Sequence, residues 1–370
     1  MTVQALRNFD IWLLFAGVAL AGYGALVIYS GSLTTYPDGI QHVSHPAVRH
    51  VAIATIGALM MVIISRVDYR AFGHIALPLY CLAVLLLCTV LVIGESTFGS
   101  KRWLNLGGMV IQVSEVAKLL TILVLAKYLS DRMEDISRIP VFLMSLIIAV
   151  IPAVLVMVEP DLGTAIIFGA IWLAMVIMAG ARREHVLMLL ALVALAAPFL
   201  ILGVLDDYQR ERLSTFVNPT GDPLGAGFAI IQGEISIGSG GLLGKGLTEG
   251  TQTQLHYLQT PTTDYIFSVL GEELGFVGAV ILFSLFIFLL FRGLRVAALA
   301  RDPYGRLIAI GIVVLILSQT FINVGVNIRL LPVTGIPLPF ISQGNSSLLT
   351  MFVSLGLLQS ILAHHRRVDI

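Results

Sequence analysis

Two charged residues inside one apolar stretch of this chain have the spacing of a functional pair. Glu115 and Lys118 are three positions apart, so on a helix they would share one face and could pair with each other or with a neighbouring helix. Charges in so apolar a setting are costly and usually face a cavity or a partner. Two interpretations are therefore open: a purely structural ion pair, or one wall of a functional cavity.

Two aspartates stand directly before apolar stretches. Asp264 follows Pro261-Thr-Thr, and Asp161 ends the short turn Glu159-Pro-Asp161. A carboxylate at such a position can cap a helix and meet the positive end of its dipole, which is the simplest interpretation of each aspartate alone. A positioned carboxylate can also act as a general base toward a hydroxyl group. We expect that second role for Asp264 if it shares a cavity with the Glu115/Lys118 pair.

The glycine-rich run Gly238-Ser-Gly-Gly-Leu-Leu-Gly-Lys245-Gly246 looks at first like a phosphate-binding loop. It fails as a nucleotide-binding motif because no strand precedes it and Gly246 replaces the Ser or Thr that would hold a metal ion. The chain also has no HExxH motif and no Cys/His cluster with zinc-ligand spacing. The sequence therefore does not support a nucleotide-driven pump or a zinc enzyme.

The composition shows what must position these residues. Of the 370 residues, 57% are hydrophobic and only 12% are charged, with a mean hydropathy of +0.94. A soluble domain has about a quarter of its residues charged, and a membrane-spanning helix needs about 20 mainly apolar residues. We therefore predict an all-α polytopic membrane protein with about ten transmembrane helices. The ten expected spans are Ile11–Ser30, Val51–Ser65, Ala71–Gly94, Gln112–Leu129, Ile139–Val158, Leu162–Ala181, Val186–Leu205, Leu274–Phe291, Leu307–Ile328 and Ser346–Ala363.

Between the seventh and eighth expected spans lies a long, mostly polar and glycine-rich loop of 57 residues, 206–262. The whole chain, 1–370, is expected to form a single integral membrane domain that contains this loop. The segment Leu331–Phe340 cannot be a regular helix, because it has prolines at 332, 337 and 339. It is typical of a re-entrant or cavity-lining turn.

The distribution of Lys and Arg predicts the orientation, because positive residues favour cytoplasmic loops. One set of alternating segments holds fourteen of the 22, so we expect both termini to be cytoplasmic and the long loop to face outward. The opposite set holds Arg49, Lys101, Arg102, Arg210, Arg212, Lys245 and Arg329. All of these except Lys101 are candidates to gather around an anionic lipid head group, since guanidinium groups suit pyrophosphate. The alternative for each is ordinary anchoring at the membrane interface.

At this point the sequence resembles the SEDS family of peptidoglycan glycosyltransferases, named for shape, elongation, division and sporulation. The matching stretches are Lys101-Arg-Trp-Leu104 with Ser114–Lys118, Glu159–Thr164, Asn218–Glu273 and Asn327–Ser347. The loop text NPTGDPLGAGFAIIQ, IGSGGLLGKG and GTQTQL looks more like the elongation member RodA than the division member FtsW. Two departures from the family pattern stand out: Thr262-Thr-Asp264 replaces a His-Thr-Asp triplet, and Gln343-Gly-Asn345 replaces Tyr-Gly-Gly.

The resemblance implies a function. Asp264 would be the catalytic carboxylate, with Glu115, Lys118 and Asp161 in the cavity. The substrates would be lipid II and the undecaprenyl-linked glycan, polymerised at the outer face of the bacterial cytoplasmic membrane. The partner would be a class B penicillin-binding protein, a transpeptidase. A helix N-terminus and Lys118 would both weaken Asp264 as a base. Either Lys118 then moves away when substrate arrives, or Asp264 positions substrate or a divalent cation, Mg or Mn.

Three alternatives are open from the sequence alone. The same cavity and charges would suit a lipid II flippase, which would move substrate between leaflets without making glycan chains. The chain could also be a scaffold that only recruits the transpeptidase. Within the enzyme interpretation, a division-type polymerase is the alternative to an elongation-type one.

Overall fold

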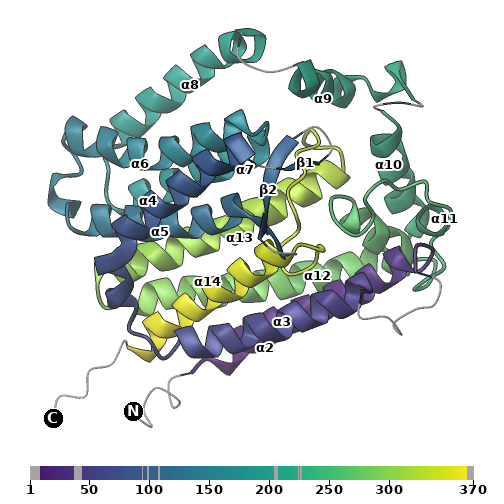
Figure 1. The fold of residues 1–370 in the computed structure, drawn as a ribbon, viewed down its shortest axis with the longest axis horizontal. Coiled ribbons are helices and arrows are strands. Elements are labelled where there is room, and N and C mark those ends of the chain that lie inside the picture. Colours follow the sequence, from purple (N-terminus) through teal and green to yellow (C-terminus); the bar gives the residue numbers. More distant parts are fainter. Residues whose placement is uncertain are drawn as a thin grey trace.

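The structure is a computed structural model that describes residues 9–36, 44–93, 95–97, 100–106, 109–203, 207–223, 225 and 227–364. Within these residues, one long helix corresponds to each of the ten expected spans (Figure 1). They are α2 (Ile11–Ser32), α3 (Pro46–Ile64), α4 (Tyr69–Ile93), α5 (Val113–Ser130), α6 (Ile139–Val158), α7 (Leu162–Met178), α8 (Arg183–Gly203), α12 (Ile266–Leu299), α13 (Pro303–Asn327) and α14 (Asn345–Ala363). Seven of them are long and apolar enough to cross a membrane, and α7 is apolar but shorter. The predicted fold class is confirmed.

A small antiparallel sheet between α4 and α5 was not predicted. Its strands are β1 (Glu95–Thr97), β2 (Ser100–Leu106) and β3 (Met109–Gln112), in the order β1-β2-β3. Trp103 of β2 stands opposite Glu95 on one side and Gln112 on the other. Since β3 runs directly into α5 at Val113, the sheet fixes the end of α5 that carries Glu115.

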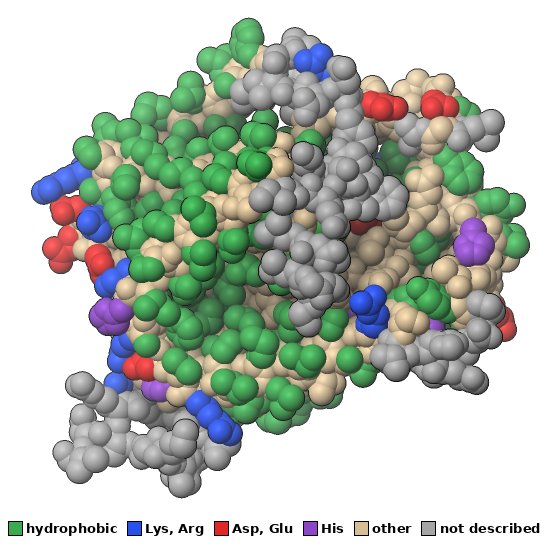
Figure 2. Space-filling model, in the orientation of Figure 1, with side chains coloured by type: hydrophobic (Ala, Val, Ile, Leu, Met, Phe, Trp, Pro, Cys, Tyr) green, Lys and Arg blue, Asp and Glu red, His purple; other side chains and the backbone are tan. Residues whose placement is uncertain are grey.

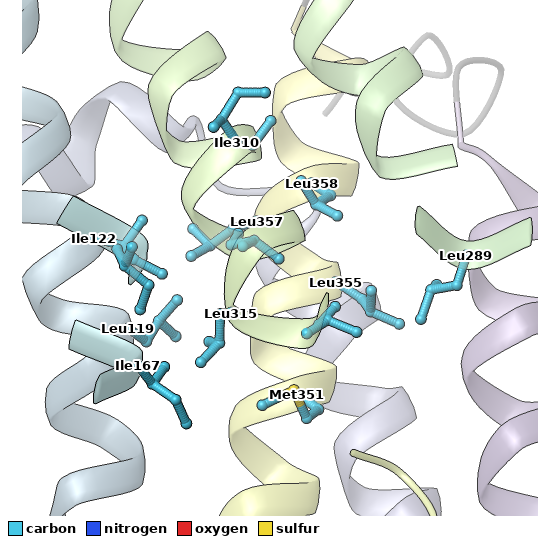
Figure 3. Close-up of a cluster of buried hydrophobic side chains, with 14 of the residues drawn as sticks. Leu119, Ile122, Ile167, Leu289, Ile310, Leu315, Met351, Leu355, Leu357 and Leu358 are labelled. Atoms are coloured by element: carbon cyan, nitrogen blue, oxygen red, sulfur yellow. The ribbon is translucent and has the colours of Figure 1, made fainter. Parts of the chain in front are cut away.

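Helices α13 and α14 form the centre of the bundle. In each, 78% of the spanning residues are buried, against 22% in α3. Figure 3 shows their apolar side chains meeting those of α5, α7 and α12; the labelled residues are Leu119, Ile122, Ile167, Leu289, Ile310, Leu315, Met351, Leu355, Leu357 and Leu358. The face of the molecule seen in Figure 2 is largely hydrophobic, with charged side chains gathered toward its edges, as expected for a surface covered by lipid.

The start of α2 and the end of α14 lie together. The side-chain amide of Gln359 on α14 bonds both backbone groups of Asp10, accepting from its N–H at 2.9 Å and donating to its carbonyl at 2.6 Å. Arg292 of α12 pairs with the Asp10 carboxylate, which also caps α2 by accepting from the N–H of Trp12. The first and last described helices therefore have these ends on the same side of the membrane, as an even number of crossings requires.

The long loop is more ordered than its composition suggested. Within its described residues are α9 (Asp207–Val217), a 3₁₀ turn η3 (Pro219–Gly221), α10 (Phe228–Gly240) and the short helix α11 (Thr251–Gln254). Helix α10 packs against α12. The eighth span was placed too late, because α12 begins at Ile266 rather than Leu274 and so takes in Glu272 and Glu273.

Helix α12 is broken at Gly275, whose φ of +63° is non-helical. The break frees the N–H groups of Phe276 and Val277, which donate to the carbonyls of Gly241 and Leu242 at 2.9 and 3.0 Å. In return, the N–H groups of Lys245 and Gly246 donate to the carbonyls of Glu272 and Glu273, both at 3.0 Å. The glycine-rich run therefore pairs the backbone of a broken helix, a need that any irregular segment within a membrane protein must meet.

We predict that Gly275→Ala destabilises the protein by about 2 kcal/mol or more, because an alanine would be strained at this φ and its Cβ would lie 2.3 Å from the N of Gly244. The control is Gly169→Ala on α7, where a Cβ would meet nothing within 4 Å. Thermal unfolding in detergent should show a clear fall in Tm for the first variant and almost none for the second. Equal melting temperatures would contradict the close packing of the glycine-rich run against the break in α12.

Candidate active site

Glu115 and Lys118 form a buried ion pair on α5. The Lys118 Nζ lies 2.8 Å from the Glu115 Oε1, and the two side chains are 0% and 1% exposed. The other carboxylate oxygen, Oε2, lies 3.5 Å from the Nε2 of Gln319 on α13. The i,i+3 spacing thus produces the pair that the sequence predicted, and α13 supplies a neighbour that it did not.

A row of amide side chains on α13 connects this pair with the segment that carries Asp264. Gln319, Asn323 and Asn327 are four positions apart and so share one face, with about 6 Å of rise between each and the next. Gln319 contacts Glu115, whereas the Nδ2 atoms of Asn323 and Asn327 donate to the backbone carbonyl of Asp264 at 3.2 and 2.8 Å. Sequence reasoning missed this row; polar residues at i, i+4 and i+8 in an apolar span were its signal.

Asp264 is half-buried and lies two residues before α12, but it is not the N-cap residue. That position belongs to Tyr265, which makes no side-chain cap bond. The cap comes from α13 instead: the Oδ1 of Asn327 accepts from the N–H of Ser268 at 3.0 Å and from its hydroxyl at 2.8 Å. The expected capping position is therefore shifted by one residue, and Asn327 holds both the helix start and the Asp264 carbonyl.

The two residues before Asp264 are held by the segment that follows α13. The N–H of Gln343 donates to the carbonyl of Thr262 at 2.8 Å, and the Ser342 hydroxyl donates to the carbonyl of Thr263 at 2.7 Å. Three consecutive carbonyls, from Thr262 to Asp264, are therefore bonded to residues between 323 and 343. Residues 331–344 are non-helical, as the prolines predicted, and Phe340 is among the side chains that the segment buries.

Asp161 takes the capping role expected of it. Its carboxylate accepts from the N–H of Thr164 at 3.1 Å and from the Thr164 hydroxyl at 2.9 Å, at the start of α7. The adjacent Gly163 lies against the non-helical segment, since a Cβ there would be 2.6 Å from Ile336 and 2.7 Å from Thr334. The Asp161 turn therefore supports the same segment that holds Thr262 and Thr263.

Of the predicted outward cations, Arg212 contacts the non-helical segment 331–344, which holds Thr262 and Thr263. It is half-buried on α9, and its Nη1 donates to the carbonyl of Val333 at 3.1 Å. Burial raises the pKa of the Tyr265 hydroxyl, the charge of Asp264 raises it further, and the Arg212 cation opposes both. The charges of Arg212 and Asp264 thus have opposite effects on the pKa of the same tyrosine.

Two of the other predicted cations form ion pairs of their own. Lys245 pairs with the buried Glu272 at 2.7 Å and donates to the Thr251 hydroxyl at 2.8 Å, so it holds the start of α11 against α12. Arg329 pairs with Glu234 on α10 at 3.4 Å. Arg49 and Arg210 are exposed on α3 and α9, and the side chain of Arg102 lies outside the described residues.

Several buried polar atoms between the Glu115/Lys118 pair and the Asp264 segment have no hydrogen-bond partner among the described residues. They include the Oε1 of Gln319, the Oδ1 of Asn323 and the hydroxyl of Tyr265. Native interiors rarely leave such atoms unpaired, so these groups are suited to contact water or a polar ligand. The chemistry available is that of a half-buried carboxylate at one end, a buried ion pair at the other, and amide groups between them.

Comparisons with known proteins agree with the motifs. A family model described as "Cell cycle protein", FTSW_RODA_SPOVE, matches residues 11–367. The probable peptidoglycan glycosyltransferase FtsW of Geobacter metallireducens is 35% identical over 369 residues, covering 98% of this chain and 96% of the relative. The peptidoglycan glycosyltransferase MrdB of Escherichia coli K12 is 37% identical over 362 residues, covering 98% and 95%.

The fold has a solved counterpart. A chain from the structure named "Structural coordination of polymerization and crosslinking by a peptidoglycan synthase complex" is 30% identical and superposes with a TM-score of 0.82, covering 97% of this chain and 99% of that one. The chain described here therefore belongs to the FtsW/RodA/SpoVE family, the SEDS family that its motifs predicted.

Proposed function

We propose that this chain is a peptidoglycan glycosyltransferase that polymerises lipid II at the outer face of the bacterial cytoplasmic membrane. Relatives that match nearly the full length of the chain are named as peptidoglycan glycosyltransferases. The structural observation that carries the proposal is the row of amides on α13, which ties the Glu115/Lys118 pair to the Asp264 segment. An acid held at one end of a polar interior is suited to a sugar hydroxyl as acceptor.

In this reaction the acceptor is a hydroxyl group of an incoming lipid II, and the donor is the glycan strand linked to undecaprenyl pyrophosphate. The hydroxyl oxygen of lipid II forms the new glycosidic bond while Asp264 takes the hydroxyl proton. At the same time the bond from the donor sugar to the pyrophosphate breaks. Cations favour the charge that develops on the departing pyrophosphate. Arg212 is the cation proposed for this role, because it is half-buried and its guanidinium donates to the carbonyl of Val333, in the segment that holds Thr262 and Thr263.

The proposal includes a partner, an orientation and a cellular role. The partner is a class B penicillin-binding protein, in keeping with the synthase complex that the fold matches. Both termini are cytoplasmic, in keeping with the excess of Lys and Arg on that side. The role is cell elongation, favoured by the loop text; relatives named FtsW and MrdB match about equally well, at 35% and 37% identity.

A divalent cation, Mg or Mn, belongs to the proposal only as a bridge to substrate. No group of three His, Cys, Asp or Glu residues that could hold a metal ion occurs among the described residues. A magnesium ion is commonly held by one or two carboxylates together with substrate phosphates. Asp264 and the pyrophosphate would be the ligands of such an ion here.

We predict that Asp264→Asn nearly abolishes polymerisation and leaves the melting temperature almost unchanged, because the amide keeps the shape of the side chain but cannot take a proton. Chain formation from labelled lipid II would be measured on detergent-solubilised protein with its penicillin-binding partner. The control is Asp131→Asn, which removes an exposed pair with Lys127 and should cost little. Full activity of Asp264→Asn would remove Asp264 from the mechanism. Absence of chains from the wild type would favour the flippase or scaffold.

The Glu115/Lys118 pair gives a separate prediction. Lys118→Met should destabilise the protein by about 3–5 kcal/mol, because it leaves a buried carboxylate without its partner. The double variant Glu115→Gln/Lys118→Met should recover most of that stability and still fail to polymerise. Tm and chain formation together decide between the two interpretations: a stable and active double variant would mean that the pair is only structural.

A further inference from the structure

Thr262 and Gln343 contact each other beside the Asp264 segment, although the two residues are 81 positions apart in the chain. The Oγ1 of Thr262 donates to the Oε1 of Gln343 at 2.8 Å. Two residues that look unrelated in the sequence thus form one contact.

This contact is a bracket of two bonds, because the backbones are joined as well. The N–H of Gln343 donates to the carbonyl of Thr262 at 2.8 Å, so each residue contributes one donor and one acceptor. Both side chains are partly buried. The threonine hydroxyl fixes the orientation of the glutamine amide, and the glutamine backbone fixes the threonine carbonyl.

The bracket is the first of three attachments that lead to Asp264. Ser342 holds the carbonyl of Thr263, and Asn323 and Asn327 hold that of Asp264. On the other side of the segment lies α2, where a Cβ at Gly31 would be 3.5 Å from the methyl carbon of Thr262. The side chain at position 262 therefore fits between α2 and Gln343, so its size and its partner must match.

We propose that Thr262 and Gln343 act as one coupled pair that positions the Asp264 segment. The proposal rests on the proposed function, in which Asp264 touches the acceptor. Neither residue is expected to take part in proton transfer; both act through the backbone between positions 262 and 264.

A double-mutant cycle tests the coupling. Thr262→Val keeps the shape but removes the hydroxyl donor, and Gln343→Met removes the acceptor. Each should lower kcat about fivefold, the loss expected for one hydrogen bond, with KM for lipid II unchanged. Together they should also cost about fivefold, because both remove the same bond. The control is Thr55→Val, because the Thr55 side chain is exposed on α3 and its hydroxyl donates to the carbonyl of Val51 in the same helix. A double loss near 25-fold, or single variants with wild-type kcat, would overturn the proposal.

A readout without activity separates this proposal from the proposed function. In a variant with Cys81→Ser and Cys88→Ser, which removes both native cysteines, Asp264→Cys would place a single thiol at the end of the segment. Thr262→Val and Gln343→Met should each change the rate at which this thiol forms a mixed disulfide with a methanethiosulfonate reagent severalfold, and to the same extent. Unchanged rates would refute positioning, whatever the wild type does with lipid II. An inactive wild type with changed rates would refute only the glycosyltransferase.

Discussion

Backbone groups at the depth of the apolar spans must find hydrogen-bond partners within the protein, since lipid offers none. Regular helix meets this need by itself, but this chain contains irregular stretches that cannot. The break in α12 at Gly275 is paired by the run Gly241–Gly246, and the carbonyls from Thr262 to Asp264 are bonded to α13 and the segment after it. The same constraint therefore shapes both the scaffold and the place where the carboxylate stands.

The partners that meet this constraint are mostly neutral. Asn323, Asn327 and Ser342 donate to the backbone carbonyls of Thr263 and Asp264 without bringing charge into the interior. Two of the buried carboxylates are paired with lysines, Glu115 with Lys118 and Glu272 with Lys245, whereas Glu273 accepts from the hydroxyl of Ser30. Pairing keeps the cost of each charge low, but it also means that each member depends on the other. Asp264 itself is half-buried at the edge of this neutral scaffold.

Apolar runs were enough to predict the ten long helices, because span length and hydropathy are local properties. The start of α12 was misplaced since Glu272 and Glu273 interrupt its apolar run, and only the tertiary contacts of Lys245 and Ser30 explain how they are buried. The small sheet has strands too short for periodicity to reveal. The Glu115/Lys118 pair followed from spacing, whereas the links from Asn327 to Asp264 and from Gln343 to Thr262 join residues 63 and 81 positions apart, which no local pattern records.

The clamp between Gln359 and Asp10 has a consequence for how the molecule is made. Its two residues are 349 positions apart, so it can form only after nearly the whole chain has left the ribosome and α14 has entered the membrane. Until then the start of α2 lacks the amide that holds it, and the central position beside α13 is unfilled. A chain cut short before α14 would therefore remain an open bundle with polar groups exposed to lipid, a form that membrane quality control can recognise and remove.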